Sequence, residues 1–182
     1  MLTKKEKQIL LSVARISIED AVNGTNSNLP EQVTPALGEK CGAFVTLHRR
    51  GELRGCIGYI EGFMPLIETV AEVASKAALE DPRFPHVATD ELNEIEIEIS
   101  ALSPLKLIKD ASEVEVGKHG IVIQNGPYRG LLLPQVATEY NWDRETFLSQ
   151  TCRKAGLSQE KWKDPQTKIH IFSADIFSEK KS

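Results

Sequence analysis

The sequence predicts an α+β protein in which a mostly antiparallel sheet is packed by helices. The composition is that of an ordinary globular chain, with 182 residues, 41% of them hydrophobic and 26% charged. Short apolar strands come in pairs joined by polar turns, which is typical of antiparallel hairpins. Helical patterns follow these hairpins and do not alternate with single strands, so a doubly wound parallel sheet is not expected.

The first predicted element is a helix from Thr3 to about Val22. Thr3 and Glu6 have the spacing of a capping box, in which each side chain bonds to the other residue's backbone. Apolar residues then recur at helical intervals and predict one buried face. Residues 23–28 have loop chemistry, and residues 29–38, with two prolines, are expected to form an irregular connector.

The next elements are a hairpin, a helix and a third strand. Residues 43–47 and 53–60 predict the two strands of the hairpin. A helix is expected from about Met64 to Leu79, where a proline-rich loop stops it. Glutamate and isoleucine alternate over residues 94–99, which predicts a strand with one acidic, solvated face and one buried face.

The second half of the chain repeats this order. Residues 120–124 and 128–133 predict a hairpin about an Asn-Gly turn. A helix capped by Asn141 is expected over residues 142–155, and residues 168–172 predict the last strand.

Both halves therefore follow the order β-β-α-β, and both carry an Arg-Gly pair in the second strand. Arg54-Gly55 occupies this place in the first half, and Arg129-Gly130 occupies it in the second. We interpret the halves as a duplication, with sub-units at about 41–102 and 117–174 inside a single domain of residues 1–182.

Composition and cysteine usage exclude several classes of protein. The formal net charge is −4, whereas proteins that neutralise many phosphates carry a basic surplus, so nucleic acid is not expected as a partner. No apolar run approaches the ~20 residues that span a bilayer, and the polar N-terminus lacks a signal-peptide core. Cys41, Cys56 and Cys152 are too widely spaced for a disulfide framework or a zinc site. We expect a cytoplasmic protein with no membrane contact and no metal site.

Residues 53–58, Leu-Arg-Gly-Cys-Ile-Gly, are the strongest candidate for a functional centre. Arg54 lies two residues from Cys56 on the same face of the strand, where its guanidinium would favour the thiolate, the nucleophilic form. Gly55 and Gly58 would let a ligand or another backbone segment come close. The alternative is structural, since cysteine often acts as a small apolar filler.

The loop at residues 81–86 is the second candidate. Asp81 and Arg83 could form an ion pair, or Arg83 could hold a carboxylate or phosphate in bidentate fashion. The structural alternative is a loop that only ends the preceding helix. Phe84-Pro85 is a candidate for a cis peptide bond.

His119 and Gln135 are the remaining candidates. His119 lies at a strand entrance close to glycines and could be a general base or a metal ligand, although a lone histidine is more often hydrogen-bonded structure. Gln135 could orient a ligand, but its surroundings look mainly like packing. The sequence has no phosphate-binding loop, dinucleotide motif, serine-hydrolase elbow or zinc-protease helix.

Together these segments resemble the AMMECR domain family, named for the human protein of the AMME syndrome chromosomal region. The resemblance extends over about residues 5–177. Its motifs are Leu-Arg-Gly-Cys-Ile-Gly at 53–58, Asp-Pro-Arg-Phe-Pro at 81–85, Gly-x-His-Gly at 117–120, Leu-Leu-Leu-Pro-Gln-Val at 131–136 and a helix from Trp-Asp to Lys-Ala-Gly-Leu at 142–157. His86 departs from the pattern, because the family often has a further proline there.

The resemblance implies an α+β fold with a larger and a smaller lobe and a cleft near the 53–58 signature, which is regarded as a possible active site. Prokaryotic members are often grouped with a Memo-like protein and a radical SAM protein in AmmeMemoRadiSam systems, which implies a shared pathway. The resemblance supplies no reaction, substrate or cofactor.

Three classes of function stay open. As an enzyme, or the partner of one, the protein would act on a small metabolite or a protein group through Cys56 and His119, with Arg54 and Arg83 binding an anion. As a binding or adaptor module, it would recognise a protein partner or a small anionic ligand without chemistry. A nucleic-acid regulator is disfavoured by the charge.

Overall fold

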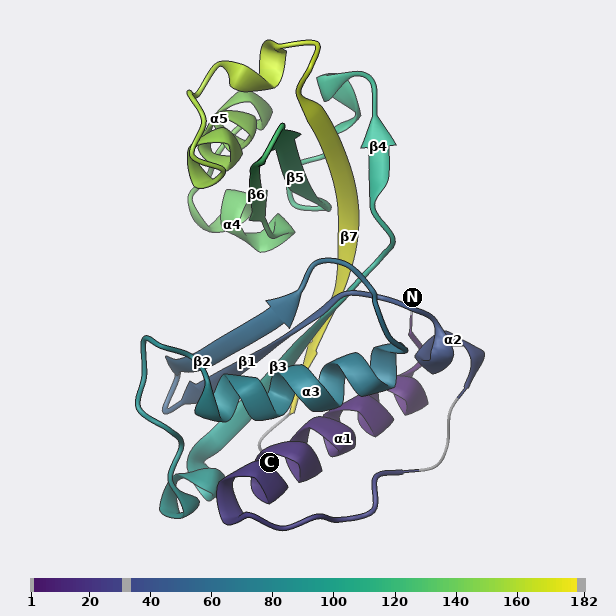
Figure 1. Cartoon of the computed structure of the whole chain (residues 1–182), viewed down its shortest axis with the longest axis vertical. Helices are drawn as coiled ribbons and strands as arrows, with labels where there is room; N and C mark the ends of the chain where they lie inside the picture. Colours follow the sequence, from purple (N-terminus) through teal and green to yellow (C-terminus); the bar gives the residue numbers. More distant parts are fainter. Residues whose placement is uncertain (1, 31–33, 180–182) are drawn as a thin grey trace. The chain divides into compact units, whose positions relative to one another are not determined.

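The computed structural model describes residues 2–30 and 34–179 (Figure 1). The chain folds into two compact units: unit 1 comprises residues 1–102 and 175–182, and unit 2 comprises residues 103–174. Both units combine antiparallel strands with helices, so the predicted α+β class is confirmed. Among the described residues, no helix is long and apolar enough to cross a membrane.

The helices of unit 1 are α1 (Lys4–Asn23), α2 (Pro35–Gly38) and α3 (Leu66–Leu79). Helix α1 begins with the predicted capping box: the Thr3 amide donates to Glu6 Oε2 at 2.7 Å, and the Glu6 amide donates to Thr3 Oγ1 at 3.3 Å. The connector expected at residues 29–38 is only partly irregular, because α2 occupies its end; its residues 31–33 lie outside the described part of the chain.

The sheet of unit 1 is centred on β1 (Ala43–Arg49). This strand pairs antiparallel with β2 (Glu52–Tyr59) on one side and with β3 (Ile95–Leu102) on the other. The end of β7 (Lys168–Ser178) lies beside β3. Helices α1 and α3 lie side by side and pack against this sheet (Figure 1). The core between the two layers is aliphatic and includes Leu10, Val13, Ile18, Val45, Leu47, Val70, Val73, Ile97 and Ile99.

Unit 2 places the first part of β7 between β4 (Lys106–Ile108) and β5 (His119–Asn125), and β6 (Tyr128–Leu132) pairs with β5. Helices α4 (Pro134–Glu139) and α5 (Arg144–Lys154) follow β6. The expected Asn141 cap is wrong, because the Thr146 amide donates to Asp143 Oδ1 at 2.8 Å and α5 begins after Asp143. Helix α4 was not predicted, since six residues are too few for a periodic pattern.

The two units share one arrangement of strands and helices. Their strand orders are β2-β1-β3 and β6-β5-β7. Along the chain, α3 comes between β2 and β3, and α4 and α5 come between β6 and β7. A Cβ atom on Gly55 would lie 2.3 Å from the Ala77 carbonyl oxygen, and one on Gly130 would lie 2.4 Å from the Ala155 amide nitrogen. In each unit, therefore, the glycine lets the end of the following helix pack against the strand. Duplication as the origin of this likeness stays a prediction.

Candidate functional site

Cys56 lies on β2, opposite Thr46 of β1. Its side chain is only partly buried, and the thiol is not in a disulfide. The Thr46 hydroxyl lies 3.2 Å from Cys56 Sγ and donates to it. The sulfur therefore has a hydrogen-bond donor from the neighbouring strand.

Asp81 connects the strand of Cys56 to the loop that follows α3. Its carboxylate is buried, and Oδ2 accepts from the Cys56 amide at 2.9 Å and from Arg83 Nη2 at 2.8 Å. Oδ1 accepts from the Arg83 amide at 3.1 Å and from Arg83 Nε at 3.0 Å. The hydrogen bonds from Arg83 hold the pKa of Asp81 far below its ordinary value, so this carboxylate is ionised at neutral pH.

Arg83 and Cys56 are connected through Asp81. The Arg83 guanidinium and the Cys56 amide both donate to Oδ2 of this carboxylate. Its hydrogen bonds to Asp81 raise the pKa of Arg83, and the nearby Cys56 acts in the same direction. The side chain is 55% exposed, and within the described chain Nη1 makes no hydrogen bond. Arg83 can therefore present one edge of its fork to an anion while Asp81 holds the other. The peptide bond before Pro85 is trans, so the expected cis bond is wrong.

Arg54 has a different set of partners. Its Nε and Nη2 donate to the two oxygens of Glu91 at 3.0 and 2.8 Å. Nη1 donates to the Pro85 carbonyl at 3.0 Å, and Nη2 also reaches the His86 carbonyl at 3.3 Å. The hydrogen bonds from Arg54 to the Glu91 carboxylate lower the pKa of Glu91 to about 2. The Arg54 side chain is only 11% exposed. The geometry therefore supports Arg54 as a clamp on residues 85–91 better than as a ligand for an external anion.

Gly55 and Gly58 are used for packing inside unit 1. Gly55 faces the backbone of α3, as described above. A Cβ atom on Gly58 would lie 2.3 Å from the ring of Phe44, its partner on β1. The close approach that these glycines allow is made by the protein's own backbone and by an aromatic ring. No external ligand is needed to account for them.

His119 and Gln135 belong to unit 2. His119 Nδ1 accepts from the Glu115 amide at 3.1 Å, which leaves Nε2 as the nitrogen that carries the proton in the neutral ring. Gln135 Oε1 is buried and has no hydrogen-bond partner among the described residues. A buried acceptor without a partner is unfavourable, and this is the strongest structural argument for a ligand at Gln135.

Thr46 and Glu91 belong to the neighbourhood of the signature but were not singled out in the sequence. The contact of Thr46 depends on the register of β1 against β2, which the hairpin pattern alone does not define. Glu91 meets Arg54 across 37 positions of the chain. Within the described residues, no three His, Cys, Asp or Glu side chains are grouped so that they could hold a metal ion.

The chain is therefore an α+β protein with a candidate thiol site, in which the buried Asp81 binds both the Cys56 amide and the half-exposed Arg83. The sequence profile of the AMMECR1 family matches residues 11–177. This chain belongs to that family.

Similar proteins come from archaea. A protein of Methanothermobacter thermautotrophicus is 43% identical over 185 residues, which cover 98% of this chain and 96% of its own. A protein of Thermococcus gammatolerans is 45% identical and covers 94% of this chain and 89% of its own. The crystal structure of the uncharacterised protein PH0010 from Pyrococcus horikoshii matches with a TM-score of 0.85 and 41% identity, over 94% of this chain and 90% of that chain. These relatives establish family and fold, and they carry no assigned reaction.

Proposed function

We propose that Cys56 is the reactive thiol of a site that acts on an anionic small molecule or protein-borne group. The observation that carries this proposal is the shared contact of Asp81 Oδ2 with the Cys56 amide and the Arg83 guanidinium. In this site the Cys56 thiolate is the nucleophile or ligand. Thr46 donates to its sulfur, and Arg83 contacts the anionic part of the substrate while Asp81 holds both residues in place.

Two residues of unit 2 carry separate proposals, which rest on contacts inside that unit. We propose that His119 is a proton-transfer group, supported by the hydrogen bond that leaves Nε2 to carry the proton. Gln135 is the proposed ligand-orienting group, supported by its buried acceptor. In unit 1, Arg54, Gly55 and Gly58 support the Cys56 site through their contacts, which hold β2 and the loop at residues 85–91 in place.

We further propose that the protein acts in the cytoplasm in a pathway with Memo-like and radical SAM proteins. Membership of the AMMECR1 family supports this partnership. The three free cysteines are compatible with a reducing compartment.

Competitive alkylation with one neutral and one anionic reagent tests the site. Limiting iodoacetamide or iodoacetate is added to the native protein at neutral pH, and mass spectrometry measures the rate at each cysteine. We expect Cys56 to react first with both reagents, ahead of Cys41 and Cys152. The iodoacetate-to-iodoacetamide rate ratio at Cys56 should fall several-fold in Arg83→Gln, because the contact for the carboxylate is lost.

Arg50→Gln is the matched control, since Arg50 is an arginine of the β1–β2 turn with a 75% exposed side chain. It should leave the ratio at Cys56 unchanged. An equal fall in both variants, or alkylation of Cys41 as fast as that of Cys56, would contradict the proposed site.

The alternative is a non-catalytic binding module. It is favoured by the 55% exposed side chain of Arg83, since a guanidinium can bind an anion without any reaction. A module of this kind would keep partner binding and pathway function in Cys56→Ser. Loss of both in a correctly folded Cys56→Ser protein would exclude it.

A further inference from the structure

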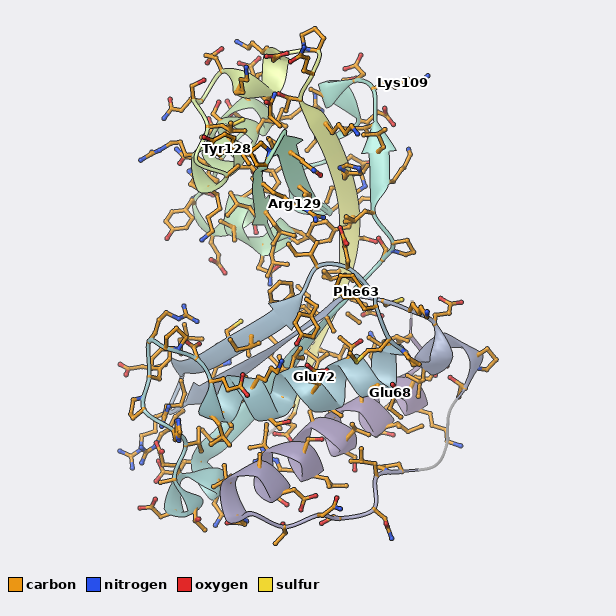
Figure 2. The ribbon with its side chains drawn as sticks, in the orientation of Figure 1. Phe63, Glu68, Glu72, Lys109, Tyr128 and Arg129 are labelled. Atoms are coloured by element: carbon orange, nitrogen blue, oxygen red, sulfur yellow. The ribbon has the colours of Figure 1, made fainter. Side chains whose placement is uncertain are left out.

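A groove of about 830 Å³ lies in unit 1, away from the residues around Cys56. It is bounded by the second half of α1, by residues 25–30 and by α3. Figure 2 shows two of its acidic residues, Glu68 and Glu72, on α3. Its volume is within the range of about 300–1,000 Å³ that is usual for small-molecule sites.

The apolar part of the groove comes from aliphatic side chains. Ile67 and Ala71 of α3 and Ala21 of α1 contribute to it, together with Leu29 from the loop. Leu29 is 40% exposed, so part of this apolar surface is open to water. A ligand with an aliphatic body would cover this surface and gain the free energy of removing it from water.

The charged side chains that line the groove are all acidic. They are Asp20, Glu68 and Glu72, and among the residues that the structure describes no lysine, arginine or histidine lines it. Asp20 accepts from the Thr25 hydroxyl at 2.5 Å and from the Ser27 amide at 2.7 Å, and the Thr25 hydrogen bond in particular lowers the pKa of Asp20. The groove therefore holds negative charge at neutral pH.

These carboxylates differ in how far the protein already neutralises them. Glu72 Oε1 accepts from the Tyr59 hydroxyl at 2.6 Å and from Lys76 at 2.8 Å. Within the described chain, neither Asp20 nor Glu68 is in an ion pair. Two acidic groups of the groove thus lack a counter-charge, and a ligand can supply it.

We propose that this groove binds an aliphatic diamine or polyamine. An aliphatic chain suits the apolar wall, and ammonium groups suit the acidic rim. The two carboxylates without a counter-charge lie on both helices that bound the groove, Asp20 on α1 and Glu68 on α3. A ligand with an ammonium group at each end of an aliphatic chain can contact both. A neutral ligand would leave the carboxylates uncompensated, and an anion would be repelled.

Calorimetric titration of the full chain with spermidine at low ionic strength tests the proposal. The Glu68→Gln variant removes one acidic group from the groove, and Ala71→Leu fills part of its apolar wall. Glu19→Gln is the matched control, because Glu19 is an exposed carboxylate of α1 that does not line the groove. Circular dichroism of each variant checks that the fold is kept.

The expected result is spermidine binding that weakens about tenfold in Glu68→Gln, the usual size of one lost charged hydrogen bond, and also weakens in Ala71→Leu. Glu19→Gln should bind as the unaltered protein does. Absence of binding, or equal binding by all four proteins, would overturn the proposal. Binding of a lysine-rich peptide without binding of spermidine would also overturn it, since the occupant would then be a protein segment.

Discussion

Gly55 offers the sharpest test of how the signature strand is built. Gly55→Ala would place a Cβ atom 2.3 Å from the carbonyl oxygen of Ala77, well inside van der Waals contact. The obstacle is helix backbone, so α3 has to move away from β2. Overpacking of this kind costs about 1–3 kcal/mol, while the lower entropy of the unfolded chain returns about 0.4–1 kcal/mol. We expect a net loss of about 1–2 kcal/mol in the free energy of unfolding of unit 1.

Native-state hydrogen exchange with mass spectrometry measures this loss, because it follows unit 1 separately. Peptides from β1, β2 and β3 should lose protection by about 5- to 30-fold in Gly55→Ala, and by more in Gly55→Val. Valine is the better strand former, so propensity alone predicts the opposite trend. Unchanged or increased protection in Gly55→Ala would refute the reasoning.

Gly130→Ala is the companion experiment in unit 2. Its Cβ atom would lie 2.4 Å from the Ala155 amide nitrogen, so a loss of similar size is expected. Trp142 and Trp162 are the chain's two tryptophans and both lie in unit 2, so fluorescence-detected urea unfolding reports this variant.

The remaining predictions concern titration. Glu91 has a pKa lowered from 4.5 to about 2 by Arg54, so its ion pair stabilises unit 1 fully above pH 4.5 and loses its effect as the pH falls towards 2. The shift corresponds to about 3 kcal/mol, and acid titration followed by circular dichroism should show a flatter acid limb in Glu91→Gln but not in Glu52→Gln. Burial raises the pKa of both Cys41 and Cys152, so their alkylation in the native protein should be slow at neutral pH and accelerate in alkali. Cys152 is fully buried and should become fully reactive only in urea; rapid labelling of native Cys152 would contradict this.

Contacts between residues close in the chain were predictable, and contacts between distant residues were not. The Thr3–Glu6 capping box was predictable because its two residues are three positions apart. The Asp81–Arg83 ion pair was one of two interpretations of its loop for the same reason. Arg54 was predicted to act on Cys56, but it binds Glu91, and Arg83 is the arginine that shares an acceptor oxygen with the Cys56 amide.

The sequence by itself determined the class of fold, the order of most elements and the segment that contains the candidate site. Capping, periodicity and turn chemistry act within a few residues, so each leaves a local pattern. Only the tertiary structure decided what the signature residues contact. Gly55 meets α3, Arg54 meets Glu91 and the Cys56 amide meets Asp81, because the packing of β2, α3 and the 81–94 segment brings together groups that are 22 to 37 positions apart. Pairing over such distances depends on strand register and helix packing, and no short stretch of sequence encodes either.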